Sequence, residues 1–215
     1  MARVRPELVD SGSWPTRELI LIEASRLFAS RGYLGTSTRD IAAAVGIRQP
    51  SLYSHFRSKQ EIAEELLRRD LSDGIATLRR LAIEGDGAAV QLYRYLLWEV
   101  TNVLETPIDL RALYLREILD LPEFAAGRRL LARYERLVAA LLERGMGEGD
   151  FLVIDVSFAQ RAVDAIILET IRGSAESFGH VHDEPDLAAS FVVRALLARP
   201  SRLASVRAAA HRAEL

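Results

Sequence analysis

Residues 37–59 read Ser-Thr-Arg-Asp-Ile-Ala-Ala-Ala-Val-Gly-Ile-Arg-Gln-Pro-Ser-Leu-Tyr-Ser-His-Phe-Arg-Ser-Lys. Ser37 can cap a helix whose first turn carries Asp40, and this Ser-x-x-Asp spacing is typical of a helix start. We expect that helix to end at Gly46, because glycine tolerates the left-handed backbone of a tight turn. Pro50 then favours a second helix, because a proline in the first turn forfeits no helical hydrogen bond. The stretch therefore predicts two short helices joined at Gly46.

Apolar side chains determine how these two helices pack. Ile41 and Val45 lie four residues apart on the first helix, and Leu52 and Phe56 have the same spacing on the second. Residues at this spacing share a helix face, so each pair forms an inward stripe. Ile47 can fill the space between the helices. The pattern is that of a helix-turn-helix whose second helix has a polar outer face.

The outer face of the second helix carries amide, hydroxyl and imidazole groups and no carboxylate, which would repel a DNA backbone. Gln49 can pair bidentately with adenine, and Ser51 and Ser54 can donate or accept hydrogen bonds at base edges. Phosphate contacts are expected from Thr38, Tyr53, His55 and Lys59. A helix rich in Ser and Gln is also a common solvated surface. The capped helix and the glycine turn before it favour a DNA-binding helix-turn-helix.

The composition is that of an ordinary soluble globular protein, with 49% hydrophobic and 27% charged residues in a chain of 215. This length suits one or two domains with a buried core. We find no run of eighteen apolar residues and no secretory signal, so we expect a cytoplasmic protein that does not engage a membrane. The chain has no cysteine, which excludes disulfides, thiolate catalysis and cysteine-ligated metal sites.

Charge is distributed unevenly along the chain. Residues 1–59 carry nine Lys or Arg against five Asp or Glu, a net charge of +4, whereas the whole chain has a net charge of −2. The remainder therefore carries −6. The basic part coincides with the helix-turn-helix, which matches the electrostatic footprint of a protein that binds the DNA backbone.

Helical periodicity continues on both sides of the motif. Thr16–Arg31 has an apolar face and closes a three-helix unit, while Ser58 and Glu61 form a capping box that starts a long helix to about Ile83. Further helices are predicted at about 88–105, 109–120, 122–145, 155–172 and 186–198. No alternating strand pattern competes. The predicted fold class is therefore all-α, with an N-terminal three-helix helix-turn-helix DNA-binding domain and a C-terminal helical ligand-binding and dimerisation domain.

Thr16–Leu67 resembles the DNA-binding domain of the tetracycline-repressor (TetR) family of bacterial transcription regulators. The matching positions, in the order and spacing of the family, are Ile20, Leu21, Ala24, Leu27, Phe28, Gly32, Thr36, Ile41, Ala42, Gly46, Ile47, Leu52, Tyr53, His55, Phe56 and Lys59. By position, the resemblance implies DNA contacts at Thr38, Arg39, Gln49, Ser51, Tyr53, Ser54, His55 and Lys59. Beyond about residue 70 the resemblance is architectural only. It favours repression over activation and identifies no ligand.

Two positions depart from the family pattern. Arg48 stands where many members carry a small hydroxyl residue that caps the recognition helix. We therefore expect no side-chain cap there, and we expect Arg48 to contact a phosphate or a guanine instead. Glu23 replaces a small residue that is common on the first helix.

The last two predicted helices have little polar surface, which indicates an oligomer seam. A palindromic operator needs a two-fold protein, with half-sites about 34–36 Å apart or a multiple of that. We therefore expect a homodimer formed through a four-helix bundle, as in similar regulators. The predicted interface residues are Ala162, Ile166, Ile167, Thr170, Ala189, Val192, Val193 and Leu196. The alternative is that both helices are buried in the core of a monomer.

A small-molecule effector site is predicted between the long helix and this seam. Aromatic side chains supply contact area there, and a few polar groups can orient a mainly apolar ligand. The candidate residues are Tyr93, Trp98, Asn102, Tyr114, Glu117, Phe124 and Tyr134. An aromatic stripe at helical spacing is also typical of a plain core, and that alternative stays open.

One cluster suggests metal chemistry, because imidazoles and carboxylates bind zinc or nickel. Its members are His180, His182, Asp183 and Glu184. Ligands so close together on one loop rarely close a tetrahedral site, so we expect no metal and no cofactor. We find no nucleophile elbow, phosphate-cradling loop or dinucleotide fingerprint, and we expect no enzymatic activity.

The predicted organisation is an N-terminal arm at 1–15, a helix-turn-helix DNA-binding domain at 16–60 and an effector-binding and dimerisation domain at 61–215. The arm holds Arg3 and Arg5 and is either a frayed terminus or a segment that reaches DNA. The predicted function is a ligand-responsive repressor that binds a palindromic operator as a homodimer and is released by a small, mainly apolar effector. The alternative is a helical binding or enzymatic protein whose basic N-terminal domain does not act on DNA.

Overall fold

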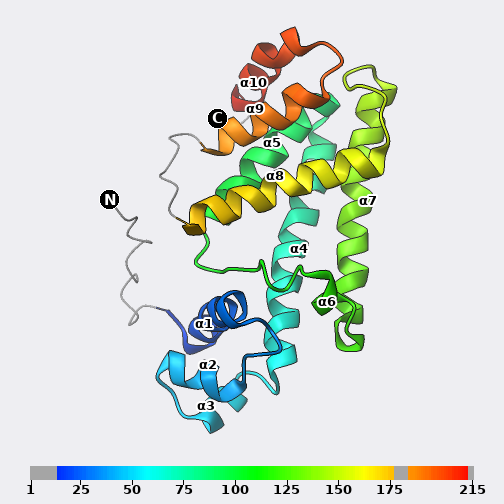
Figure 1. The fold of residues 1–215 in the computed structure, drawn as a ribbon. Coiled ribbons are helices and arrows are strands. Elements are labelled where there is room, and N and C mark those ends of the chain that lie inside the picture. The colour runs from blue at the N-terminus through cyan, green and yellow to red at the C-terminus, as the bar shows by residue number, and fades with distance from the viewer. Residues whose placement is uncertain (1–13, 177–183, 213–215) are drawn as a thin grey trace. The chain divides into compact units, whose positions relative to one another are not determined.

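The computed structural model describes residues 14–176 and 184–212, with the backbone alone described for 171–176 (Figure 1). The helices of the described residues are α1 (Thr16–Arg31), α2 (Thr38–Val45), α3 (Gln49–Tyr53), α4 (Lys59–Glu84), α5 (Ala88–Glu105), α6 (Arg116–Leu119), η1 (Pro122–Phe124), α7 (Ala125–Gly147), α8 (Val156–Glu176), α9 (Glu184–Leu196), η2 (Pro200–Arg202) and α10 (Leu203–Arg212). Extended pairing among these residues is limited to one isolated bridge between Phe151 and Leu197. The predicted all-α class is confirmed.

The ends of α2 are determined by its sequence as predicted. Asp40 donates its backbone N–H to the Ser37 hydroxyl, and the Asp40 carboxylate accepts the backbone N–H of Ser37, which completes a capping box. Gly46 ends the helix in the left-handed region, at φ 76° and ψ 24°. Arg48 precedes α3 without a side-chain cap, also as predicted. These local signals position α3 directly after the turn.

The start of α4 differs from its prediction in one detail. Glu61 donates its backbone N–H to the Ser58 hydroxyl at 3.1 Å, which is half of a capping box. The Glu61 carboxylate instead accepts the backbone N–H of Arg57 at 2.6 Å. The acidic side chain therefore caps the residue before the expected one.

The predicted helix at 109–120 is wrong for most of its length, because only Arg116–Leu119 is helical. The Asp109 carboxylate accepts the backbone N–H of Arg111 and pairs with its guanidinium, while the Asp109 backbone donates to the Ser25 hydroxyl at 3.0 Å. An aspartate that bonds the backbone two residues onward favours a turn over a helix. The bond to α1 then holds this turn in place.

The described chain divides into two compact units. The first contains the residues up to Ser72 together with Thr106–Leu131, and the second contains Asp73–Glu105 and the residues from Ala132 onward. Helices α4 and α7 contribute residues to both units. The boundary at residue 60, between the predicted DNA-binding domain and the predicted effector-binding and dimerisation domain, stays a prediction.

The core of the first unit lies beneath the helix-turn-helix. Leu52 and Phe56, from α3 and the turn after it, are 0% and 1% exposed and pack with Ile20, Leu21 and Ile41. Further along the same core, the ring of Tyr33 makes edge contacts with Phe28 and Phe124. The three helices and the start of α4 thus close around one apolar centre.

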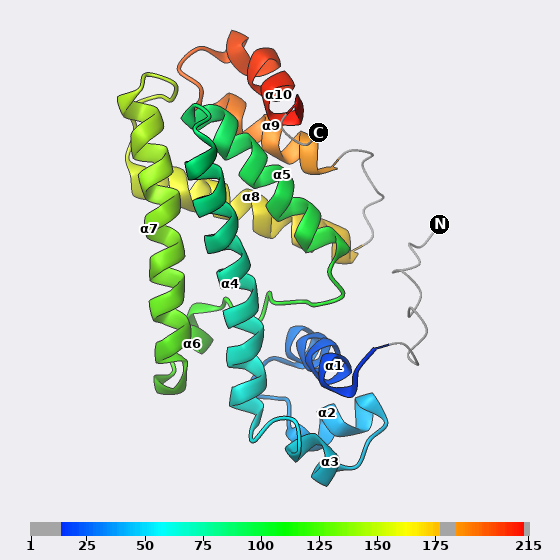
Figure 2. The same cartoon turned by 180° about the vertical axis from the view of Figure 1, so that it is seen from behind.

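The second unit is built around α5, against which α8, α9 and α10 pack (Figures 1 and 2). Asp186 of α9 joins three helices of this unit. Its carboxylate accepts hydrogen bonds from the Tyr93 hydroxyl of α5 and the Arg207 guanidinium of α10. His211 of α10 lies 2.7 Å from the same carboxylate. None of the described helices is both long and apolar enough to span a membrane.

Candidate nucleic-acid interface

Helix α3 turns one face inward and presents the other to solvent. Leu52 is fully buried, whereas Ser51, Tyr53 and Ser54 are exposed, as is His55 directly after the helix. The residues from Ile47 to Gln60 include no acid. The exposed face therefore offers hydrogen-bond donors and acceptors without a repelling negative charge.

Three polar side chains of α2 and α3 contact one another. The Gln49 amide nitrogen donates to the Thr38 hydroxyl at 3.1 Å and to the Tyr53 hydroxyl at 3.4 Å. The two hydroxyl oxygens lie 3.2 Å apart. Sequence reasoning placed all three residues at the interface but missed their contact, because Thr38 lies eleven residues before Gln49 on another helix. The three side chains form a cluster that links the two helices at their outer surface.

The other predicted DNA-contacting residues of the motif are exposed to solvent. Arg39 and Arg48 are exposed. The Ser54 hydroxyl donates to the Ser51 carbonyl at 2.7 Å, and both serines are exposed. The structure therefore keeps these groups accessible to a ligand that approaches α3.

Lys59 has a structural contact that the sequence did not reveal. Its ammonium donates to the Tyr33 carbonyl at 2.7 Å and lies 4.3 Å from the centroid of the Tyr33 ring. Burial lowers the pKa of Lys59, an effect that the Glu123 charge opposes. The side chain thus joins the start of α4 to the turn after α1, in addition to its predicted phosphate contact.

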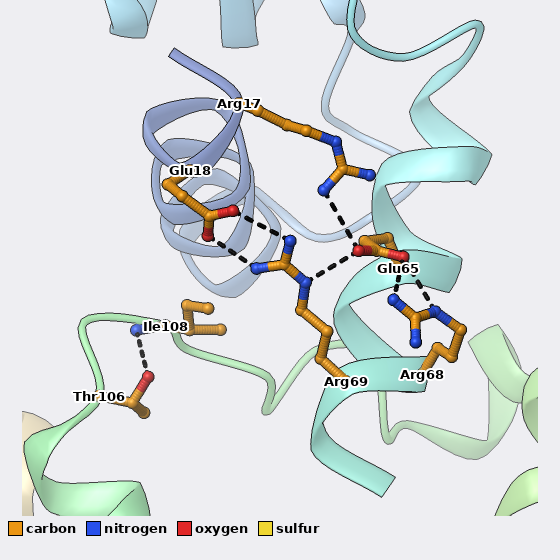
Figure 3. Close-up of polar contacts among 7 residues, drawn as sticks. All are labelled: Arg17, Glu18, Glu65, Arg68, Arg69, Thr106 and Ile108. Atoms are coloured by element: carbon orange, nitrogen blue, oxygen red, sulfur yellow. Dashed lines mark hydrogen bonds and ion pairs between the residues drawn. The ribbon is translucent and has the colours of Figure 1, made fainter. Parts of the chain in front are cut away.

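An ion-pair network connects α1 to α4 within the same unit (Figure 3). Arg69 of α4 donates to both carboxylate oxygens of Glu18 on α1, at 2.7 and 3.0 Å, and to Glu65 at 2.8 Å. Glu65 also accepts bonds from Arg17 at 3.2 Å and from Arg68 at 2.7 Å. Two arginines of α4 and one of α1 thus meet at the Glu65 carboxylate.

These contacts change the acidity of the two glutamates. Burial alone would raise the pKa of Glu65, but hydrogen bonds from Arg68, Arg69 and Arg17 outweigh it and lower the pKa to about 2. The hydrogen bond from Arg69 likewise lowers the pKa of Glu18. The network therefore requires both carboxylates to be ionised.

The predicted effector residues fall into both units. Tyr114, Glu117 and Phe124 belong to the first unit, where Phe124 is fully buried against Tyr33 and is a core side chain. The other predicted members belong to the second unit and are Tyr93, Trp98, Asn102 and Tyr134. A single pocket lined by all seven stays a prediction.

Within the second unit, Tyr95 brings two of the predicted aromatic residues together. Its ring lies 6.1 Å from Trp98 and 6.3 Å from Tyr134, measured between centroids. Its hydroxyl lies 2.5 Å from the Tyr134 hydroxyl and donates to Glu99 at 3.1 Å. Burial raises the pKa of Tyr95 well above its ordinary value. No sequence motif distinguishes Tyr95 from an ordinary core residue.

Another perturbed carboxyl group lies on α8. Burial, together with the Glu135 charge, raises the pKa of Asp164 to about 6. No sequence motif marked this residue, because the effect arises from packing rather than from neighbours in the chain.

The predicted dimer residues differ in their burial, and their contact with a partner stays a prediction. Five of them belong to the core of the same chain and offer little surface: Ile167, Ala189, Val192, Val193 and Leu196. Ala162 is exposed, and Ile166 and Thr170 are partly exposed. The exposed apolar side of α8 and α9 is instead formed by Phe158, Leu168, Leu187 and Phe191. Both helices are apolar on more than one side, so periodicity alone could not tell the two faces apart.

The predicted metal cluster lies mostly outside the described residues, which include only Glu184 of its four members. Among the residues that the structure does describe, no group of three or more His, Asp or Glu side chains is arranged to hold a metal ion.

Known proteins resemble this chain along most of its length. Residues 20–66 match the family described as "Bacterial regulatory proteins, tetR family". The chain is 33% identical to the HTH-type transcriptional repressor KstR2 of Rhodococcus jostii over 155 residues, which cover 70% of this chain and 76% of that protein. The crystal structure of Mycobacterium smegmatis AmtR is similar with a TM-score of 0.78 and 26% identity, covering 94% of this chain and 96% of that one. The structure of AibR in complex with isovaleryl coenzyme A and operator DNA shares the fold, with a TM-score of 0.68, 18% identity and coverage of 85% and 98%.

We predict that Glu65→Gln destabilises the protein in a pH-dependent way. The carboxylate is more acidic when folded, so its stabilisation is present above its ordinary pKa of 4.5 and is lost as the pH falls toward 2. The shift corresponds to about 3 kcal/mol without solvent screening. Arg17 and Arg68 are 39% and 58% exposed, so we expect a loss of about 1 kcal/mol near neutral pH.

The measurement is the free energy of urea unfolding of the wild type and the variant at about pH 6 and about pH 3. The matched control is Glu64→Gln, one residue earlier, whose carboxylate accepts a hydrogen bond from the neutral Gln60 amide. A difference between Glu65→Gln and the wild type that stayed constant over this pH range would contradict the ionised network.

Proposed function

Because this chain belongs to the TetR family of bacterial regulatory proteins, we propose that it is a ligand-responsive repressor, which binds a palindromic operator as a homodimer and is released by a small, mainly apolar effector. The observation that carries the proposal is the exposed, acid-free face of α3 beside the two exposed arginines, Arg39 and Arg48. Such a face suits hydrogen bonding to base edges together with phosphate contacts.

On this proposal, the interface residues divide into two groups by their chemistry. Gln49, Ser51 and Ser54 offer amide and hydroxyl groups to base edges. Phosphate oxygens are bound by Thr38, Arg39, Tyr53, His55 and Lys59, with Arg48 contacting either a phosphate or a guanine. The phosphate contacts position α3, and the base contacts provide sequence preference.

The proposed dimer forms through the exposed apolar side of α8 and α9. Leu187 and Phe191 of α9 line a groove together with Ile166 of α8, and these apolar groups lie beside Glu169 and Arg194. An exposed apolar face of this kind supports a contact with another protein. A second copy of this chain is the occupant that fits best, because two-fold pairing would supply the two recognition helices that a palindrome requires.

The proposed effector site uses the aromatic residues of the second unit. The half-buried rings of Trp98 and Tyr134 supply contact area, the Tyr134 hydroxyl and Glu99 supply polar groups, and the fully buried Tyr95 contacts all three. AibR, which shares this fold, binds isovaleryl coenzyme A as well as operator DNA. That likeness supports a ligand for this chain without identifying it.

The proposed coupling between ligand and DNA passes through α4, because this one helix contributes residues to both units. A ligand that favours a different arrangement of α4 would change the spacing of the two recognition helices in the dimer. It can shift operator occupancy only by as much as its affinities for the two arrangements differ. The ion pairs between α1 and α4 would transmit the movement of α4 to the helix-turn-helix.

The rival is a helical binding or enzymatic protein whose basic N-terminal unit does not act on DNA. The named relatives are transcriptional regulators, which favours the regulator. The two alternatives differ in what the exposed face of α3 is for, and so a variant of that face separates them.

We predict that Gln49→Ala combined with Tyr53→Ala weakens operator binding at least tenfold, because each good base contact contributes about 1–3 kcal/mol. The operator is first obtained by selecting DNA from a random pool with the full-length protein, and binding is then measured by gel shift. Arg129→Ala, which alters an exposed residue of α7, serves as the control and should bind normally. If no DNA is enriched from the pool, the rival is favoured. Unchanged binding of the double variant to an enriched operator, with the wild-type melting temperature, would refute the role of Gln49 and Tyr53 in binding.

We predict that Phe191→Glu dissociates the dimer. The Phe191 side chain is 65% exposed, so the substitution is tolerated in a single chain, but in a two-fold contact it removes two apolar groups and adds two charges. Losing about 1.5–3 kcal/mol for each ring raises the dissociation constant at least about a hundredfold. Sedimentation velocity measures this, with Ile83→Glu, at a site 86% exposed on α4, as the control. A Phe191→Glu protein that remained as dimeric as the wild type would refute this interface.

We predict that a mainly apolar compound that raises the melting temperature also weakens operator binding. A tenfold loss of affinity would correspond to a coupling free energy of about 1.4 kcal/mol. Titrating the compound into the gel-shift reaction tests this. If stabilising compounds left operator affinity unchanged, ligand binding and DNA binding would not be coupled.

A further inference from the structure

The cluster of Thr38, Gln49 and Tyr53 places three polar atoms in a nearly equilateral triangle. Its sides are 3.1 Å from the Gln49 amide nitrogen to the Thr38 hydroxyl, 3.4 Å from that nitrogen to the Tyr53 hydroxyl, and 3.2 Å between the hydroxyls. Thr38 is the first residue of α2, and Gln49 and Tyr53 are four residues apart on α3. The amide is therefore held both across the turn and along its own helix.

The number of protons on the Gln49 amide and on the two hydroxyls explains why the amide nitrogen, rather than the amide oxygen, faces the hydroxyls. An amide nitrogen carries two protons and each hydroxyl carries one, so all three sides of the triangle can be hydrogen bonds. With the amide reversed, three oxygens would share only two protons, and one side would be an oxygen–oxygen contact without a proton. The observed orientation is thus the one in which every contact is satisfied, and it turns the Gln49 carbonyl oxygen away from the two hydroxyls.

A carbonyl oxygen accepts hydrogen bonds and cannot donate them. In the major groove, the donors are the exocyclic amines, on N6 of adenine and N4 of cytosine, whereas O6 and N7 of guanine and O4 of thymine are acceptors. An outward oxygen is attracted to an amine and repelled by an acceptor. An outward amide nitrogen would have the opposite preference.

We propose that Gln49 reads an exocyclic amine in the major groove through its carbonyl oxygen alone, in place of the bidentate adenine contact expected from the sequence, and that Thr38 and Tyr53 are positioning residues that set this orientation. The inference rests on the proposed DNA-facing role of α3. It assigns Thr38 and Tyr53 a part in sequence preference beyond their predicted phosphate contacts. The two hydroxyls need only one proton between them, so one hydroxyl proton is left for a phosphate oxygen, and only one of the two residues can donate to it.

The first test changes the DNA and leaves the protein intact. Full-length protein selects an operator from a random pool, and the base pair whose preference disappears in Gln49→Ala is identified. At that pair, an adenine is replaced by unsubstituted purine, which lacks the 6-amino group, or a cytosine is replaced by the analogue that lacks the 4-amino group. Deleting the amine should weaken wild-type binding roughly tenfold, and it should have little effect on Gln49→Ala.

The second test changes the positioning residues and measures base preference rather than affinity. Thr38→Val combined with Tyr53→Phe keeps the shape of both side chains but removes both hydroxyls. The preference for the base pair that places an amine opposite Gln49, over the pair that places an acceptor there, should then fall below about threefold. Thr38→Ser, which retains a hydroxyl, should keep the preference of the wild type. Because preference is a ratio measured within each variant, a general loss of affinity does not affect it.

The outcomes separate this inference from the proposed function. If no sequence is enriched from the random pool, the proposed repressor function fails. If a sequence is enriched but deleting the amine is harmless at the Gln49-dependent pair, the inference alone is overturned. A Thr38→Val, Tyr53→Phe protein that retained the full wild-type preference would show that the two hydroxyls do not orient the amide.

Discussion

The burial of Leu52 and Phe56 is the constraint on which the DNA-facing surface depends. Helix α3 has only five residues, and isolated helices much shorter than about 12 residues are not stable in water. These two side chains, 0% and 1% exposed, each contribute about 1.5–3 kcal/mol by leaving water. The core therefore holds α3 in place. Without it, Gln49, Ser51 and Tyr53 would not be held at fixed positions on the surface of the unit.

Polar contacts add to the positioning of α3 and α4 that the apolar core provides. The cluster of Thr38, Gln49 and Tyr53 fixes side-chain orientation at the outer surface, while Arg69 ties Glu18 of α1 to Glu65 of α4 beneath it. These contacts act at different levels. The apolar core determines where α3 lies, the network determines how firmly α4 is attached to α1, and the cluster determines what α3 offers to a ligand. A regulator needs all three, because sequence preference and its control both depend on a rigid reading surface.

The helix-turn-helix could be predicted from sequence because its signals are local. Ser37 and Asp40 cap α2 within one turn, and Gly46 ends it in the conformation that its lack of a side chain permits. The ion pairs could not be predicted, because Glu18 and Arg69 are 51 residues apart. Nor could the bond between Asp109 and Ser25, which holds in place the turn that replaces most of the predicted helix at 109–120. On α8 and α9 the sequence indicated apolar surface, but it could not show that the chain's own core occupies one side of it.

We propose that the exposed face of α3 enters the major groove of DNA. Protection of guanine N7 from dimethyl sulfate tests it directly, because this atom is reached from the major groove. On DNA selected by the full-length protein, we expect protected guanines in two patches about one helical turn apart, or a multiple of that. Reactivity unchanged by saturating protein across the whole selected site would contradict the claim.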